Sequence, residues 1–293
     1  MRITNGMIYR NFINNLFRIN EHLEEDYEKI ASGKRIKSPS DDPLGMARSI
    51  RYRSYLSTIR QYKRNIEMAI SWQNLTESAL NGVENALQKV QEIAISQASD
   101  TANANTRKNA AKEIENIKKH ILGIVNTKFG NRYIFAGYIT DKQPFSESDN
   151  NYHGDEGLIK IRINSNTQLS FNIPGSVFAP ADGINIFQMI DNLKDAMENN
   201  EPENIRACLD EIKQALDQVI NAKASLGAKM NLFEEIKVQL ADMDLDFTGI
   251  ISSTEDADLA KVTIDLGIYQ TVYQATLTAT AKAIPINLFN YLG

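Results

Sequence analysis

One span of the sequence, from about Pro43 to about Ser99, has helical periodicity and holds proline only at its first position. A proline is tolerated there because the first N–H groups of a helix lack intrahelical partners, and Gly82 inside the span costs only about 1 kcal/mol. The apolar stripe comprises Ile50, Ile59, Ile66, Ile70, Leu80, Val83, Leu87, Val90 and Ala94. A helix of about 55 residues is about 80 Å long, which predicts an elongated molecule.

A shorter helix precedes this span. Its stripe contains Phe12, Leu16, Ile19, Leu23, Tyr27 and Ile30. Thr4 or Asn5 can cap its start, and Gly33 is suited to the position after its end. In the loop that follows, Asp42 is a good N-cap for the long helix.

Three further helices are predicted downstream. A third helix runs from about Thr106 to about Phe129, and a fourth from about Asn185 to Glu198. A fifth, long helix opens at Pro202 and ends near Asp246, with Gly249 as the break. Ser252 and Glu255 then have the spacing of a capping box, which predicts a last helix over residues 253–293.

The segment between the third and fourth helices has a different pattern. Ile159, Ile161 and Ile163 alternate with charged residues, and Leu169, Phe171 and Ile173 alternate with polar residues. Two such runs, separated by residues 164–168, predict a β-hairpin with one buried face.

The C-terminal helix is apolar on two sides. Residues 266–281 carry no charge. Leu259, Val262, Leu266, Tyr269 and Tyr273 form one row, and Ile264, Ile268, Val272, Ala275 and Ala279 form another. A helix of this kind needs neighbours on two sides, and its Thr and Gln residues make it too polar to span a membrane. It fits the centre of a soluble bundle, or a helix that completes its burial when copies assemble.

Together these segments predict a mainly α protein, an elongated rod of long antiparallel helices with paired N- and C-terminal helices and a small β-rich insertion. Three domains are expected. They are a terminal helical domain of residues 1–42 and 250–293, a long-helix rod of 43–135 and 184–249, and an outer insertion of 136–183.

Composition and motifs argue against catalysis. The net charge is −5, and the single Cys208 excludes an internal disulfide. The N-terminus has no apolar segment typical of a secretory signal. The common phosphate-binding and nucleophile motifs are missing. His22, His120 and His153 are scattered, and Asp41 and Asp42 suit a helix start better than a metal pair. We therefore expect no enzyme, no cofactor, no metal site and no membrane span.

Residues 48–64 are the strongest candidate for nucleic-acid binding, with six basic residues among three tyrosines. On a helix, Tyr52, Tyr55 and Tyr62 share one face with Ile59, so the tyrosines belong to the packing stripe. The basic residues, Arg51 and Arg53 among them, are then better explained as a surface that meets a neighbouring subunit than as a nucleic-acid site.

Several segments of the sequence carry a family resemblance. Ser32-Gly33-Lys34-Arg35-Ile36, followed by Pro39-Ser40-Asp41-Asp42-Pro43, resembles the N-terminal signature of bacterial flagellins and their hook-associated relatives. The opening Met1-Arg2-Ile3-Thr4 and the ending Leu288-Phe289-Asn290-Tyr291-Leu292 are similar to the paired termini of that family. Phe129-Gly130-Asn131-Arg132-Tyr133-Ile134-Phe135-Ala136-Gly137, with Pro144-Phe145 after it, favours the hook–filament junction branch. Ile284-Pro285-Ile286 departs from the usual polar residues there.

The resemblance implies a structural adaptor of the flagellum with no catalytic role. It implies export through the flagellar type III channel without a cleaved signal, a cytoplasmic export chaperone, and terminal helices that are disordered in the free monomer. The implied partners are hook-associated protein 1, flagellin and other copies in a ring, at an extracellular location. The predicted assembly residues are Leu16, Ile19, Leu23, Leu266, Tyr269, Tyr273, Arg51 and Arg53. A short flagellin and a soluble coiled-coil scaffold remain alternatives.

Overall fold

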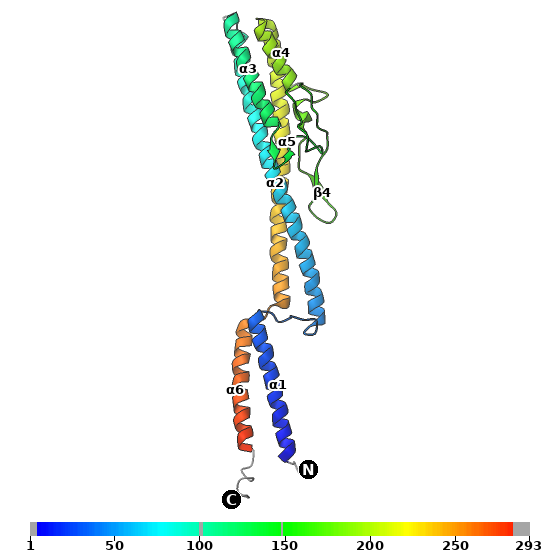
Figure 1. Cartoon of the computed structure of the whole chain (residues 1–293), viewed down its shortest axis with the longest axis vertical. Helices are drawn as coiled ribbons and strands as arrows, with labels where there is room; N and C mark the ends of the chain where they lie inside the picture. Colours follow the sequence, from blue (N-terminus) through cyan, green and yellow to red (C-terminus); the bar gives the residue numbers. More distant parts are fainter. Residues whose placement is uncertain (1–4, 100–101, 148, 284–293) are drawn as a thin grey trace. The chain divides into compact units, whose positions relative to one another are not determined.

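A computed structural model describes residues 5–99, 102–147 and 149–283 of the chain. Its helices are α1 (Asn5–Ser32), α2 (Pro43–Gln97), α3 (Ala104–Val125), α4 (Ile186–Glu198), α5 (Pro202–Glu255) and α6 (Leu259–Ala283). The fold is mainly α, as predicted, with two small two-stranded sheets (Figure 1). No described helix is both long enough and apolar enough to cross a membrane.

The described chain forms two compact units. Among the described residues, the first contains 5–58 and 244–283, and the second contains those between 59 and 243. In the first unit, α1 and α6 lie side by side (Figure 1). The three-domain division remains a prediction.

The second unit has a closed core. Helices α3 and α4 pack against each other. Asn185 caps α4 by accepting hydrogen bonds from the backbone N–H groups of Phe187 and Gln188, a role for which asparagine is favoured. The fully buried apolar side chains on α3 and α4 include Ile114, Ile121, Val125, Ile186, Ile190, Leu193 and Met197.

The β-rich insertion belongs to this unit. Strands β3 (Lys160–Arg162) and β4 (Gln168–Ser170) form the predicted hairpin, with Ile161 opposite Leu169. The buried face includes Ile161, Ile163, Phe171 and Ile173. Trp72 on α2 packs against Phe171, with ring centroids 5.6 Å apart, so the insertion is anchored to the long helix.

The third helix is shorter than predicted. It ends at Val125, and Lys128–Phe129 form β1, which pairs with β2 (Arg132–Tyr133). Gly130, with φ +61°, lies in the turn between these strands, so the chain forms a short hairpin here instead of further helix. The prediction of helix as far as Phe129 was therefore wrong.

Helix α5 is longer than predicted. It continues through Gly249 to Glu255, so neither the break at Gly249 nor the capping box at Ser252 and Glu255 exists. The last helix instead begins at Leu259, and Asp258 caps it by accepting hydrogen bonds from the N–H groups of Ala260 and Lys261. A single glycine in a long helix costs about 1 kcal/mol, too little to end it where the flanking residues favour helix.

The joint between the helix pairs

Both helix-to-helix connections of the first unit meet at one place, here called the joint and defined as residues 33–37 together with 254–257. Lys34 and Asp256 form an antiparallel bridge. The N–H of Arg35 donates to the carbonyl of Glu255 at 2.6 Å, and the N–H of Ala257 donates to that of Gly33 at 3.0 Å. The α1–α2 loop and the α5–α6 link are therefore joined by backbone hydrogen bonds.

The loop side of the joint is shaped by local signals that the sequence shows. Gly33 has φ +68°, and its N–H donates to the carbonyl of Lys29 at the end of α1. Asp41 accepts hydrogen bonds from the N–H groups of Ser38 and Lys37, and these lower the pKa of its carboxyl group. Asp42 accepts from the N–H of Gly45 at 2.9 Å and caps α2. The roles predicted for Gly33 and Asp42 are thus confirmed.

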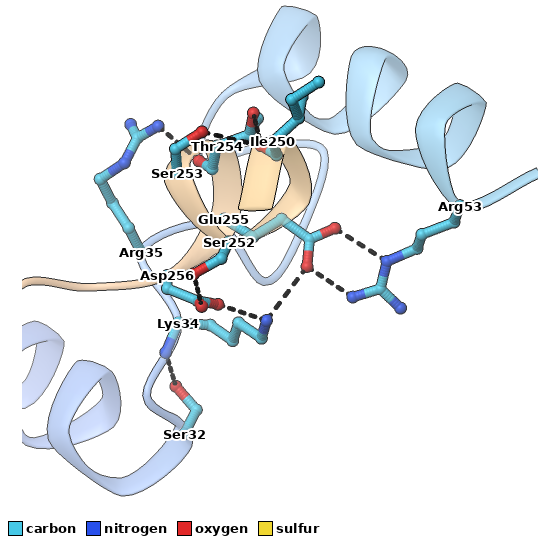
Figure 2. A network of polar contacts seen from close by, with 10 residues as sticks. All are labelled: Ser32, Lys34, Arg35, Arg53, Ile250, Ser252, Ser253, Thr254, Glu255 and Asp256. Atoms are coloured by element: carbon cyan, nitrogen blue, oxygen red, sulfur yellow. Dashed lines mark hydrogen bonds and ion pairs between the residues drawn. The ribbon is translucent and has the colours of Figure 1, made fainter. Parts of the chain in front are cut away.

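A buried carboxylate holds the joint together. Glu255 is 3% exposed and lies at the C-terminal end of α5, where a negative charge opposes the helix dipole. Its two carboxylate oxygens accept hydrogen bonds from Nε and Nη2 of Arg53 on α2, and Nζ of Lys34 lies 3.3 Å away (Figure 2). Lys34 also donates to Asp256, and Arg35 donates to the carbonyl of Thr254.

These contacts shift the titration of the cluster. The hydrogen bonds from Arg53 hold the pKa of Glu255 below its ordinary value, and Lys34 does the same for Asp256. The pKa of Lys34 is raised in turn, chiefly by its hydrogen bond to Asp256. The cluster is therefore ionised at neutral pH and ties the α1–α2 loop, α2 and the end of α5 together.

The paired terminal helices

Helix α1 ends at the joint and helix α6 begins just after it, and the two helices run antiparallel. Between them, Gln270 donates to the hydroxyl of Tyr27 at 2.9 Å, and the rings of His22 and Tyr269 stack with centroids 5.0 Å apart. Of the side chains described on these helices, only Leu23, Asp26 and Val262 are buried. The pair therefore lacks the continuous core of a finished domain.

Two positions of the α1 stripe, Tyr27 and Ile30, differ from the prediction, and Ile30 is 38% exposed. Asp26 is buried and Tyr27 is 52% exposed, although the sequence pattern placed the tyrosine in the stripe. One carboxylate oxygen of Asp26 lies 3.1 Å from Nζ of Lys29, and the other has no partner among the described residues. A buried polar atom without a partner costs free energy, so it weakens this pair.

The two predicted rows of α6 have different environments. In the first row, Val262 is buried and Leu266, Tyr269 and Tyr273 are half-buried, while Leu259 at the start of the helix is exposed. The second row is open: Ile264 is 64% exposed, Ile268 53% and Val272 41%. The α6 outer row, defined as these three residues with Ala275 and Ala279, is therefore an apolar surface that the described chain leaves uncovered.

The structure separates the eight predicted assembly residues into three groups. Leu16, Ile19, Leu23, Leu266, Tyr269 and Tyr273 lie on the buried and half-buried sides of the terminal pair, Arg53 binds Glu255, and Arg51 is exposed. Their role in assembly remains a prediction. The sequence interpretation missed Glu255 and Asp256, because a Ser-x-x-Glu spacing also fits a capping box.

No group of three or more His, Cys, Asp and Glu side chains in the described part of the chain is placed to hold a metal ion. Thr4, residues 284–286 and the ending 288–292, on which some of the expectations rest, lie outside the described residues.

Comparison with known proteins finds similarity to proteins of the bacterial flagellum. Residues 3–140 match the family described as the bacterial flagellin N-terminal helical region. Flagellar hook-associated protein 3 of Escherichia coli K12 is 28% identical, with 99% of each chain aligned. Flagellin of Bacillus subtilis is 26% identical, over 97% of this chain and 96% of that protein. The crystal structure of Bacillus cereus FlgL has the same fold, with a TM-score of 0.61 and 24% identity over 69% of this chain and 99% of that one.

The chain is thus similar to the bacterial flagellins over residues 3–140. It is similar to flagellar hook-associated protein 3 along its full length.

Proposed function

We propose that this chain is the structural adaptor that joins the hook to the flagellin filament. Its likeness to hook-associated protein 3 over 99% of both chains carries the proposal. Its partners are then hook-associated protein 1 on the hook side, flagellin on the filament side, and further copies of itself in a ring. It has no catalytic role and binds neither nucleic acid nor membrane.

The terminal pair supplies the surface that assembly requires. The α6 outer row is uncharged and exposed, and burying apolar surface contributes about 25 cal/mol per Å². An open apolar row beside a thin core suits helices that become stable only against neighbouring subunits. We infer that the terminal pair is disordered in the free monomer and that a cytoplasmic chaperone covers it before export by the flagellar type III system to the cell exterior.

Deletion of the gene tests the role directly. Cells should carry bare hooks, and intact monomeric flagellin should accumulate in the medium, because filament subunits are exported with nothing to build on. Normal filaments in the deletion strain would contradict the proposal.

A filament subunit is the second candidate, favoured by the near full-length likeness to Bacillus subtilis flagellin. The same deletion separates the two functions. Bare hooks with no flagellin in the medium would identify this chain as the filament subunit itself. Purified protein that elongates on filament seeds would support the same conclusion.

The variant Leu266→Asp tests the terminal pair. A charge on this half-buried side should leave an exported, soluble monomer but should block junction formation, because a charge at an interface core is costly to desolvate. Export is measured in the medium, and junctions are counted on isolated hooks. Normal junctions in this variant would exclude a central role for Leu266.

A further inference from the structure

Two exposed stripes of the first unit have the same spacing and opposite charge. The acidic stripe on α1 comprises Phe17, Glu21, Glu24 and Glu28, and the basic stripe on α2 comprises Leu44, Arg48, Arg51 and Tyr55. Steps of four, three and four residues put each set on one helix face. Each stripe is about 16 Å long at 1.5 Å per residue.

Both stripes are open to solvent. Phe17 is 71% exposed, Leu44 62% and Tyr55 52%, and the charged members are exposed as well. Glu24 accepts a hydrogen bond from Asn20, and Glu28 lies 3.2 Å from Nζ of Lys37, also at the surface. Among the described residues, no side chain pairs with Glu21, Arg48 or Arg51.

This pattern is unfavourable in a single chain. Like charges three and four residues apart on a helix repel each other, and each stripe also exposes at least one large apolar side chain. A partner of opposite charge with apolar residues would relieve both costs. Complementary charges fix the register of an interface and exclude wrong partners.

We propose that the acidic stripe of one copy packs on the basic stripe of a neighbouring copy. The inference rests on the proposed function, because it names the residues through which copies associate in the ring. Every copy carries both stripes, so the contact is heterologous and passes from copy to copy, as a ring or helical array requires. Arg53 takes no part, because Glu255 binds it within the chain.

Charge reversal and its rescue test the pairing. Arg48→Glu with Arg51→Glu, and separately Glu21→Arg with Glu24→Arg, should each abolish filaments, because they set like charges against each other. The four changes together in one chain restore opposite charges and should restore filaments. Ser57→Glu is the control, because Ser57 is exposed on α2 outside the stripe, and it should leave filament number unchanged.

Two results would overturn the pairing. One is normal filaments with either charge-reversed stripe, and the other is a fourfold variant that folds but does not recover filaments. Thermal melting of the purified variants checks folding. Neither result affects the adaptor role, which the deletion phenotype tests separately.

Cysteine cross-linking identifies the protein that contacts the two stripes. The chain's own Cys208 is 6% exposed, so introduced cysteines react without competition. A chain carrying Glu24→Cys and Arg51→Cys, oxidised in isolated hook–filament structures, should give products at multiples of 32.9 kDa, while each single-cysteine chain should give only monomer. A cross-link to flagellin or another flagellar protein, or no cross-link from the double variant, would exclude the contact between copies.

Discussion

The α3/α4 pair and the α1/α6 pair are both made of two packed helices, but they are stabilised differently. Between α3 and α4, Ile121, Ile190 and Leu193 are completely buried. The α1/α6 pair has two buried apolar side chains, each 8–9% exposed, and a buried aspartate. Isolated helices are marginal without tertiary packing. The α3/α4 pair completes its core within one chain, whereas the α1/α6 pair does not.

The largest expected effect comes from opening the closed core. Leu193→Ala should destabilise the second unit by about 2–5 kcal/mol, because it leaves a cavity. Leu266→Ala in the half-buried row of α6 should cost less than about 1 kcal/mol, because less surface leaves solvent there. Chemical denaturation of the two variants measures the difference. Equal losses would contradict the contrast between the pairs.

Gly45→Ala tests the first turn of α2 beside the joint. A Cβ at this position would lie 2.6 Å from Cδ1 of Ile36, which is 3% exposed, and closer still to the capping carboxylate of Asp42. We expect a loss of about 1–3 kcal/mol from overpacking. Gly249→Ala is the matched control: nothing lies within 4 Å, so it should stabilise α5 by about 0.5–1 kcal/mol. A thermal melt of each variant gives the sign of the effect.

Acid should open the joint before it affects the closed core. The pKa of Glu255 is lowered from an ordinary value of 4.5 in the folded state. Its stabilisation is therefore complete above that value and is lost as pH falls through the lowered folded pKa. The N–H groups of Arg35 and Ile36 donate to the carbonyl of Glu255. The protection of these two amides against exchange, relative to the intrinsic exchange rate at each pH, should fall below about pH 4.5.

Glu255→Gln should remove most of this acid dependence and cost about 1–2 kcal/mol at pH 7, because it weakens charged hydrogen bonds. Glu234→Gln is the control, because that carboxylate pairs only with Lys237 at the surface, and it should cost less than about 0.5 kcal/mol. An unchanged exchange profile in the Glu255 variant would mean that another group controls the joint.

The smallest effect on the monomer should come from the α6 outer row. Ile268→Thr changes a side chain that is 53% exposed, so the free energy of unfolding should stay within about 0.5 kcal/mol. Junction formation should nevertheless fail or weaken in cells, because this row needs a neighbour. A large stability loss in the purified monomer would show that the row is already covered within the chain.

Local signals predicted most of the fold. Gly33 and Asp42 mark helix ends through their own backbone and side-chain chemistry, and both roles were predicted. Asn185 was predicted only as the approximate start of its helix. The alternation around Ile161 and Phe171 likewise predicted the hairpin. The two rows of α6 also followed from spacing alone.

The errors arose where contacts between residues distant in sequence determine where a helix ends or which of its faces is buried. Gly249 lies inside α5 because the helix continues to the joint, where Glu255 has partners that are distant in sequence. The burial of Asp26 instead of Tyr27 depends on how α1 meets α6, which the stripe on α1 alone does not determine. The opposite charges of the stripes on α1 and α2 can be read from the sequence, but only the structure shows that both stripes are exposed.

The bridge at the joint also affects the order in which parts of the chain fold. Lys34 and Asp256 are 222 residues apart, so this contact closes a very long loop, and closing such a loop costs conformational entropy before any contact compensates for it. Contacts between residues closer in sequence form faster than more distant ones. Helices α3 and α4 are closer in sequence than Lys34 and Asp256, so the second unit can form while α1 is still unpaired. Helix α1, the first helix of the chain, is therefore among the last to pack, because its partner α6 follows the joint.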